Sequence, residues 1–238
     1  MNKFLTIIIP SYNEADRLGG TLDQYLRFFK QEDIDFLVVL NGCTDGTLNI
    51  AQKYQKEHPD RVSYLDIKEA IGKGGAIREG FKVAQAKYIS FLDADASTSP
   101  EEFQKLIDNL DQADGVIASR WKKGSKIIGA NFIREVVSIG FIVFVKILFW
   151  MSYVDTQCGA KIFKSEVIKK ILPRMRINNM TVDVEILYLI KQEGYKIIEI
   201  PTIWEDNSDS SAALGSPFKL FKASFGMFST LLKIRFGK

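Results

Sequence analysis

Short, nearly continuous apolar runs alternate with amphipathic segments over the first 120 residues of the chain. Such runs are typical of strands buried on both faces of a sheet, and they lie at residues 4–9, 35–40, 62–66, 88–92 and 116–119. Between them, helical spacing of apolar residues predicts helices at residues 14–30, 44–57, 74–86 and 100–110, the last of them with Ser99 as its N-cap. This alternation predicts a single α/β domain with a mainly parallel sheet covered by helices on both faces.

The chemically distinctive residues of the chain follow directly after the predicted strands. They form five segments, which are Pro10-Ser11-Tyr12-Asn13-Glu14, Asn41-Gly42-Cys43-Thr44-Asp45-Gly46-Thr47, Ile71-Gly72-Lys73-Gly74-Gly75-Ala76-Ile77-Arg78, Asp93-Ala94-Asp95 and Ser119-Arg120. Because ligands of such sheets bind at the carboxyl ends of the strands, we expect these segments to meet in one site. Each segment also has an ordinary interpretation as a helix cap, a turn or a surface ion pair, so none of them alone establishes a function.

Two of the segments carry charges that suit a phosphate-bearing ligand. Asp93 and Asp95 stand one residue apart at the end of an apolar strand, where carboxylates are costly to bury without a cation. Their oxygens are hard ligands that suit Mg²⁺ or Mn²⁺. Lys73 and Arg78 lie beside glycines at a predicted helix N-terminus, an arrangement that favours anions although it lacks the P-loop pattern.

Composition excludes several classes of protein. A chain of 238 residues with 46% hydrophobic and 26% charged residues forms a packed core rather than a disordered chain. The two cysteines, Cys43 and Cys158, cannot build a disulfide framework and favour a reducing compartment. The single histidine, His58, excludes histidine-rich zinc sites. With a net charge of only +3, we expect no nucleic acid partner.

Two apolar segments predict contact with a membrane surface. Residues 127–154 are rich in aromatic side chains, but charged residues such as Arg134 leave an uncharged centre too short for a membrane span. Residues 216–238 repeat apolar side chains at helical spacing and carry lysine and arginine but no acid. Each segment is interpreted either as a helix packed on the core or as a helix lying among anionic lipids. We therefore expect one domain at residues 1–215 with a membrane-facing helical insertion at residues 127–154, followed by a basic amphipathic helix at residues 216–238.

Together these segments resemble the family-2 glycosyltransferases, inverting enzymes of the GT-A fold that use nucleotide sugars. The matching motifs are Pro10-Ser11-Tyr12-Asn13-Glu14, Thr44-Asp45-Gly46-Thr47, Gly72-Lys73-Gly74 with Arg78, and Asp93-Ala94-Asp95. The resemblance covers nearly the whole chain. It implies a Rossmann-like GT-A domain and a glycosyltransferase that depends on Mg²⁺ or Mn²⁺.

Within that family the chain is similar to the synthases of polyprenyl- or dolichyl-phosphate sugars. The pointers are Ser119-Arg120, Asp155-Thr156-Gln157-Cys158-Gly159-Ala160-Lys161-Ile162-Phe163, Asp183-Val184-Glu185, and Glu199-Ile200-Pro201 followed by Trp204. The run that begins at Asp155 is most similar to the dolichyl-phosphate glucosyltransferase branch. The resemblance implies transfer of a hexose, glucose or mannose, from UDP-glucose or GDP-mannose to a polyprenyl or dolichyl phosphate. It places the protein on the cytoplasmic face of a membrane, bound there alone or through an anchor subunit.

The chain departs from the family pattern at one position. The family usually carries two acids after the second strand, one of which contacts the base of the nucleotide, whereas this chain has Leu40 and Asn41. An amide keeps both donor and acceptor capacity, so Asn41 can still hold a nucleoside. The departure leaves the identity of the donor nucleotide open.

The resemblance also implies roles for particular residues. Asp95 is the expected direct metal ligand, Asp93 its partner, and Arg120 a cation that neutralises the leaving diphosphate. The implied substrate-binding residues are Pro10, Tyr12, Asn13, Glu14, Asn41, Lys73, Asp93, Ala94, Lys161 and Asp183. A polar segment at residues 206–215 is expected to form a loop near the site or a plain connector.

The acceptor decides whether catalysis needs a general base. A lipid phosphate, with a second pKa of about 6, is already mostly anionic at neutral pH and needs only cations to dock; Arg120, Lys161 and Arg134 are the candidates. A saccharide hydroxyl must lose a proton, and Asp155 is then the first candidate base and Asp183 the second. Two alternatives therefore stand beside the lipid-phosphate enzyme. One is a family-2 enzyme that acts on a saccharide hydroxyl, and the other is a catalytically silent nucleotide-binding subunit of a membrane complex.

Overall fold

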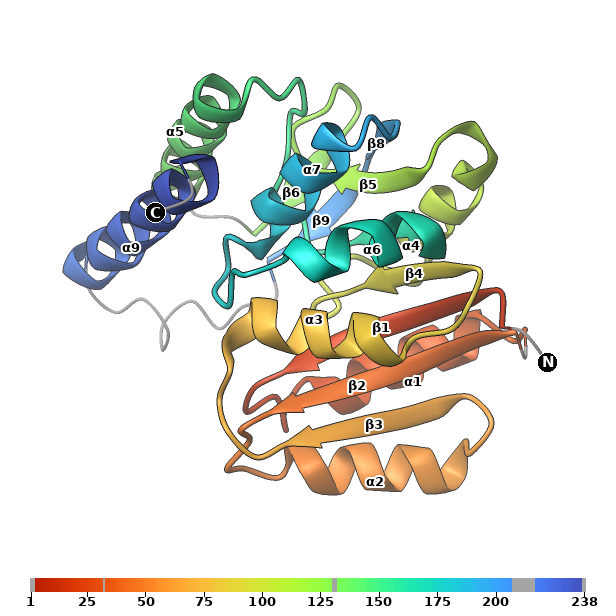
Figure 1. The fold of residues 1–238 in the computed structure, drawn as a ribbon. Helices are drawn as coiled ribbons and strands as arrows, with labels where there is room; N and C mark the ends of the chain where they lie inside the picture. The colour runs from red at the N-terminus through yellow and green to blue at the C-terminus, as the bar shows by residue number, and fades with distance from the viewer. Residues whose placement is uncertain (1–2, 32, 130–131, 207–216, 237–238) are drawn as a thin grey trace.

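The buried apolar runs of the chain form one central sheet in the order β3-β2-β1-β4-β7-β5-β8 (Figure 1). The computed structural model describes residues 3–31, 33–129, 132–206 and 217–236. The strands of the sheet are β1 (Leu5–Ser11), β2 (Ile34–Asn41), β3 (Val62–Ile67), β4 (Tyr88–Phe91), β5 (Gly115–Ser119), β7 (Lys161–Lys164) and β8 (Ile197–Pro201). Within this sheet β7 runs antiparallel to both of its neighbours, β4 and β5, while the other strand pairs are parallel. Two short parallel strands, β6 (Lys126–Ile128) and β9 (Ile203–Glu205), form a separate pair.

Helices cover both faces of the sheet and enclose two hydrophobic clusters. One cluster joins the sheet to the helices α1, α2 and α4, and the other joins it to α3, α5, α6, α7 and α9. The helices are α1 (Leu18–Phe28), α2 (Thr47–Glu57), α3 (Gly72–Val83), α4 (Pro100–Ile107), α5 (Phe132–Phe149), α6 (Ser165–Ile171), α7 (Val182–Gln192) and α9 (Pro217–Phe236), with 3-10 turns at Leu110–Gln112 and Leu172–Arg174. This layered arrangement confirms the predicted α/β fold.

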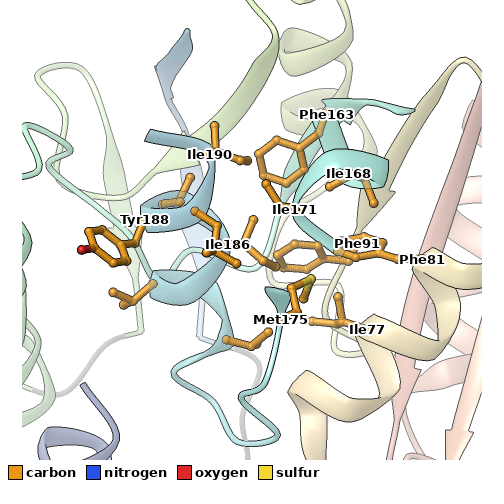
Figure 2. Packing of buried hydrophobic residues seen from close by; sticks show 14 of the residues in the cluster. Ile77, Phe81, Phe91, Phe163, Ile168, Ile171, Met175, Ile186, Tyr188 and Ile190 are labelled. Carbon is orange, nitrogen blue, oxygen red and sulfur yellow. The ribbon is translucent and has the colours of Figure 1, made fainter. Parts of the chain in front are cut away.

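Large side chains from the central strands fill the second cluster. Phe91 of β4 and Phe163 of β7 are fully buried, and they pack among side chains of α3, α6 and α7 (Figure 2). The ring of Phe81 on α3 lies 6.2 Å from that of Phe91, centroid to centroid. Because helices on this face pack directly on β4 and β7, the backbone that leaves β4 at its carboxyl end has a fixed position.

Helices α5 and α9 pack against each other beside this cluster (Figure 1). Phe144 of α5 meets Phe228 of α9 edge to face, with ring centroids 4.7 Å apart, and Leu231 of α9 is fully buried. The interpretation as core helices is therefore correct for the inner faces of both. In the parts of the chain that the structure describes, no helix combines the length and the apolar character needed to cross a membrane.

The predicted elements of the first 120 residues are all present, with shifted ends. The first helix begins at Leu18 rather than at residue 14, because the chain forms a turn at residues 15–17 before it becomes helical. Strand β7 was not predicted, because Lys161 and Lys164 interrupt its apolar pattern. Of the predicted loop at residues 206–215, positions 207 to 215 lie outside the described residues, as do the side chains of residues 132–137 and 217–225, Arg134 among them.

The predicted cap of α4 is confirmed and can be tested. The Ser99 side-chain oxygen accepts a hydrogen bond from the backbone N–H of Glu102 at 3.4 Å. We expect Ser99→Ala to lower the free energy of unfolding by about 1 kcal/mol, as the loss of an N-cap typically does. Ser165 at the start of α6 is the matched control, because its side-chain oxygen has no hydrogen-bond partner. Urea unfolding of both variants measures the difference, and equal losses would show that the cap contributes nothing.

Candidate active site

A cleft of about 470 Å³ opens where β1, β2 and β4 end and α3 begins. Eight of the residues predicted from the sequence line it, and these are Pro10, Tyr12, Glu14, Asn41, Lys73, Asp93, Ala94 and Asp95. Ser11, Ala70, Gly72 and Met180 complete the lining. The ends of β1, β2 and β4 and the start of α3 therefore meet in one cleft, whereas Ser119 and Arg120, from the fifth predicted segment, are not among the residues that line it. Met180, from the segment before α7, was missed because nothing in the local sequence distinguishes it from a core methionine.

The loops after β1 and β2 are joined to each other by side chains. The Asn13 side-chain oxygen accepts from the backbone N–H of Thr44 at 2.8 Å, and the hydroxyl of Thr47 accepts from the backbone N–H of Glu14 at 2.8 Å. Asp45 accepts from the N–H of Ala15 at 3.1 Å. Asn13 was expected to hold the nucleoside. In the structure its side-chain oxygen joins two loops and Asn13 is not among the residues that line the cleft, so this role stays a prediction.

Asn41 lines the cleft, but its oxygen is already engaged. It accepts from the backbone N–H of Ile71 at 2.7 Å, which fastens the end of β2 to the start of α3. The next residue, Gly42, has a φ of +67°, and a Cβ there would press against the backbone of Ala70. The side-chain oxygen of Asn41 thus already has one partner within the protein, and the role of this amide in holding a nucleoside stays a prediction.

Asp93 and Asp95 follow β4 and face the cleft from one turn. Oδ1 of Asp93 lies 2.6 Å from Nζ of Lys73 on α3, and Oδ1 of Asp95 accepts from the N–H of Ser97 at 3.0 Å. Burial alone would raise the pKa of Asp93, but the Lys73 ammonium holds it below its usual value. Burial and the charge of Asp93 together raise the pKa of Asp95. The pair thus contains one carboxylate whose anionic form Lys73 stabilises and one whose anionic form is disfavoured by burial and by its neighbour.

Gly159 leaves room for the Asp93 carboxylate. A Cβ at Gly159 would overlap Oδ2 and the carboxyl carbon of Asp93, so only glycine fits at this point of the chain. The Asp93 carboxylate therefore lies directly against the backbone at Gly159.

The donor set of this cleft fits Mg²⁺ or Mn²⁺. Within the described residues there is no group of three or more histidine, cysteine, aspartate or glutamate side chains that could hold a metal ion. Two carboxylates suffice for Mg²⁺ when substrate phosphates and water supply its other ligands. Asp93 and Asp95 are thus suited to an ion that is also held by a diphosphate.

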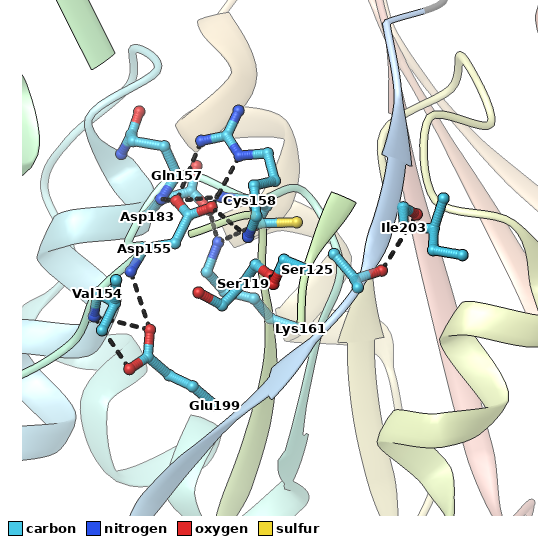
Figure 3. A network of polar contacts seen from close by, with 12 residues as sticks. Ser119, Ser125, Val154, Asp155, Gln157, Cys158, Lys161, Asp183, Glu199 and Ile203 are labelled. Atoms are coloured by element: carbon cyan, nitrogen blue, oxygen red, sulfur yellow. Dashed lines mark hydrogen bonds and ion pairs between the residues drawn. The ribbon is translucent and has the colours of Figure 1, made fainter. Parts of the chain in front are cut away.

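Arg120, which follows β5, forms a two-pronged ion pair with Asp155, which is labelled in Figure 3. Its Nε lies 2.7 Å from Oδ2 and its second amino group 3.0 Å from Oδ1. The Asp155 carboxylate also accepts backbone N–H groups from Arg120, Gln157 and Cys158. Glu199 of β8 in turn accepts the N–H groups of Val154 and Asp155 at 2.8 and 2.9 Å, which holds this segment against the sheet.

This geometry corrects two expectations. Asp155 is fully buried, and although burial would raise its pKa, Arg120 lowers it, so the carboxylate is a poor proton acceptor. This disfavours Asp155 as the general base, the role that the sequence suggested only for a saccharide acceptor. The fork of Arg120 holds a carboxylate, whereas the sequence predicted that it holds a phosphate.

The surroundings of Lys161 and Asp183 also differ from those that their predicted roles require. Lys161 has no exposed surface, and its Nζ contacts the carbonyl of Cys158 and the carboxylate of Asp183. It cannot dock the phosphate of a lipid. Asp183 is nearly fully buried between Lys161 and Lys73, so it too is unsuited to act as a base.

Comparison with known proteins identifies relatives along most of the chain. The model of the family Glycosyl transferase family 2 matches residues 6–178. The chain is 29% identical to a dolichyl-phosphate beta-glucosyltransferase of Dictyostelium discoideum, over 99% of this chain and 75% of that protein. It is 32% identical to the dolichyl-phosphate beta-glucosyltransferase of Saccharomyces cerevisiae, over 89% of this chain and 70% of that protein.

Solved structures share the fold. A mannosyltransferase from Pyrobaculum calidifontis in complex with GDP-Man and Mn²⁺ matches with a TM-score of 0.68 and 18% identity, over 98% of this chain. The match spans 65% of that mannosyltransferase chain. Glucosyl-3-phosphoglycerate synthase from Mycobacterium tuberculosis, in complex with Mn²⁺, UDP and glucosyl-3-phosphoglycerate, matches with a TM-score of 0.70 and 15% identity, over 98% of this chain and 80% of that one. These matches show the GT-A fold.

The role of Asp155 as the partner of Arg120 can be tested by Asp155→Asn. Removing one charge of a buried ion pair leaves the other without compensation, so we expect a loss of about 3–5 kcal/mol of stability at pH 7. Because the folded pKa of Asp155 is depressed, its contribution is complete above the unfolded pKa of about 4 and declines as the pH falls below it. Denaturant unfolding at several pH values measures this.

The matched control for this prediction is Asp66→Asn. Asp66 pairs with Lys68 at the surface, and such exposed pairs contribute less than about 1 kcal/mol. An Asp155→Asn protein of unchanged stability that has lost activity would instead restore Asp155 as a base.

Proposed function

The chain belongs to glycosyl transferase family 2, and we propose that it transfers glucose from UDP-glucose to a dolichyl or related polyprenyl phosphate at a membrane surface. The observation that carries the proposal is the meeting of Asp93, Asp95 and Lys73 in one cleft at the ends of the parallel strands. Relatives named for the transfer of glucose to dolichyl phosphate align with most of the chain. GDP-mannose is the alternative donor.

The cleft supports binding of a nucleotide sugar across the strand ends. Tyr12 and Glu14 line the side formed by the loop after β1, where a nucleoside would lie, and Asp93 and Asp95 line the side where its diphosphate would lie. A divalent ion held by the two aspartates supplies positive charge to the leaving diphosphate. Lys73 adds a further cation at the same place, since neighbouring carboxylates raise its pKa despite its burial.

The acceptor that best fits this site is already anionic. An oxygen of the lipid phosphate attacks the anomeric carbon from the face opposite the diphosphate, while the bond from that carbon to the diphosphate breaks and the nucleotide leaves with the electron pair. This single displacement inverts the anomeric carbon and requires no proton transfer. Asp155 and Asp183, the two candidate bases, are both engaged by cations, which favours a phosphate over a saccharide hydroxyl as acceptor.

The proposed transfer is tested with the purified protein, Mn²⁺ or Mg²⁺, and labelled UDP-glucose or GDP-mannose. We expect label from UDP-glucose to enter the lipid fraction when dolichyl phosphate is present. Asp95→Asn should reduce this transfer by at least about 100-fold, because the developing charge on the leaving diphosphate loses its stabilisation. Asp111→Asn, at an exposed position of the 3-10 turn Leu110–Gln112, is the matched control. Unchanged turnover in Asp95→Asn would contradict the proposed role of the acidic pair, and label in a water-soluble saccharide would contradict the acceptor.

We also propose that the outer faces of α5 and α9 rest on the membrane. Ile139, Val143 and Ile147 form an exposed apolar stripe on α5, and Trp150, which follows the helix, has 81% of its surface exposed. Leu232 and Phe236 are exposed on α9. Apolar helix faces with flanking cations are typical of helices that lie in the membrane interface.

Basic side chains surround the end of α9 on the same part of the molecule. Arg174 and Arg176 line a concavity of about 660 Å³ together with Lys233 and Arg235 of α9. Such a surface attracts anionic lipid headgroups. The two cysteines are free thiols, which supports the cytoplasmic face as the side of attachment.

Membrane contact through α5 is tested by Ile147→Asp. Replacing an apolar side chain that inserts among lipids by a carboxylate should weaken binding to phosphatidylcholine–phosphatidylglycerol vesicles by about tenfold, since burial of such a side chain contributes roughly 1.5–3 kcal/mol. Val83→Asp is the matched control, because Val83 is an exposed valine at the far end of α3. Co-sedimentation measures both variants, and equal binding by wild type and Ile147→Asp would refute the contact.

A further inference from the structure

Four side chains of alternating charge lead from the interior of the sheet to the cleft. Nζ of Lys161, on β7, contacts Oδ1 of Asp183 in the first turn of α7 (Figure 3). Oδ2 of Asp183 lies 3.8 Å from Nζ of Lys73, in the first turn of α3. The same Nζ lies 2.6 Å from Oδ1 of Asp93. Lys73 is therefore shared unequally between two carboxylates, with Asp93 the nearer.

Burial decreases steadily along this chain of charges. The exposed fractions of the side chains are 0% for Lys161, 2% for Asp183, 11% for Lys73 and 37% for Asp93. Lys161 also contacts the carbonyl of Cys158 and lies over the ring of Phe91, so the inner pair is held from several sides. Lys73 lies between this inner pair and Asp93, which is the most exposed of the four side chains. Only 11% of the Lys73 side chain is exposed, so solvent screens its charge poorly.

The Lys73 ammonium lies on Oδ1 of Asp93, one of the two oxygens with which this carboxylate could hold a metal ion. A divalent ion held by Asp93 and Asp95 would lie close to this ammonium. The two cations would repel each other strongly, because the site is partly buried and water screens their charges poorly. Asp183 offers Lys73 a second partner. A shift of about 1 Å in the position of Nζ converts the 3.8 Å separation into an ordinary charge-assisted hydrogen bond.

We infer that Lys73 is the resident counter-ion of Asp93, that it yields this position when a divalent ion binds, and that Asp183, held by Lys161, receives it. Lys161 and Asp183 are then positioning residues that act through Lys73 and touch neither substrate nor metal. The inference rests on the proposed function in one respect, namely that Asp93 and Asp95 are the ligands of the metal ion.

The arrangement predicts effects of opposite sign for two variants. Lys73→Met removes the competing cation, so Mn²⁺ alone should bind more tightly, by about fivefold, the upper range for one partly exposed ion pair. Asp183→Asn removes the charge that receives Lys73, so the ammonium stays on Asp93 and Mn²⁺ should bind more weakly by a similar factor. A purely structural role would weaken binding in both variants.

The experiment is a titration of the full chain with Mn²⁺ in the absence of nucleotide, followed by the electron paramagnetic resonance signal of the free ion. Lys82→Met is the matched control, since Lys82 lies on the same helix and pairs with Glu79 at the surface. In the double variant Lys73→Met with Asp183→Asn, the loss caused by Asp183→Asn should disappear, because there is no longer an ammonium to receive. This double variant also separates the effect from a folding defect, since its melting temperature is measured beside its affinity.

Three outcomes decide the inference. Tighter binding in Lys73→Met together with weaker binding in Asp183→Asn supports it. Unchanged or weaker binding of Mn²⁺ in Lys73→Met overturns it. It is also overturned if Asp183→Asn lowers the affinity for Mn²⁺ equally in the wild-type and the Lys73→Met background. These results are distinguishable from a failure of the proposed function, which shows instead as Mn²⁺ binding that is indifferent to Asp95→Asn, or as an absence of glucose transfer.

Discussion

The structure depends on keeping two carboxylates charged at the partly buried end of a strand. Asp93 and Asp95 follow β4, a fully buried strand near the middle of the sheet. Carboxylates in such a place are unstable as anions unless cations or hydrogen bonds compensate them. The surrounding elements supply this compensation. Lys73 reaches Asp93 from α3, and the turn after β4 donates the N–H of Ser97 to Asp95.

The antiparallel strand β7 and the residues just before it place further groups next to the charged side chains of the site. Strand β7 lies between β4 and β5, the two strands whose ends carry Asp93 and Arg120. Its approach from the opposite direction brings Gly159 against the Asp93 carboxylate and places Lys161 behind it. The residues just before β7 likewise bring Asp155 to Arg120. One reversed strand therefore positions both charged groups of the site.

An interaction could be predicted from the sequence when the residues that make it are close together along the chain, and it could not when they are far apart. Continuous apolar runs are local signals, and the rule that ligands bind at strand ends places Tyr12, Asn41 and Asp93 together without further information. Pairing between charged residues is not local. Arg120 and Asp155 are 35 residues apart, and an arginine near a phosphate-binding edge has the same sequence pattern whether it binds a phosphate or a carboxylate.

Lys161 is the clearest case of this ambiguity. A lysine in a polar motif is ordinarily solvated, and the sequence favoured a docking cation. It is instead fully buried, which is tolerable because Asp183 and a backbone carbonyl satisfy its ammonium. Asp183 comes from α7, and neither partner carries a local signal of the other. The same absence of a local signal explains why β7 itself was missed, since the lysines at its two ends leave only two apolar residues between them.

The segment between α6 and α7 links the cleft to the proposed membrane surface. Met180 lines the cleft, while Arg174 and Arg176 line the concavity beside the end of α9. Glu185 of α7 accepts the backbone N–H groups of Arg176 and Ile177, which fixes this segment against the helix that also carries Asp183. A carbonyl of Ile177 in turn lies so close to Gly74 that no side chain fits between this segment and α3. The segment between α6 and α7 thus contributes side chains both to the cleft and to the concavity, and contacts with α7 and α3 hold it in place.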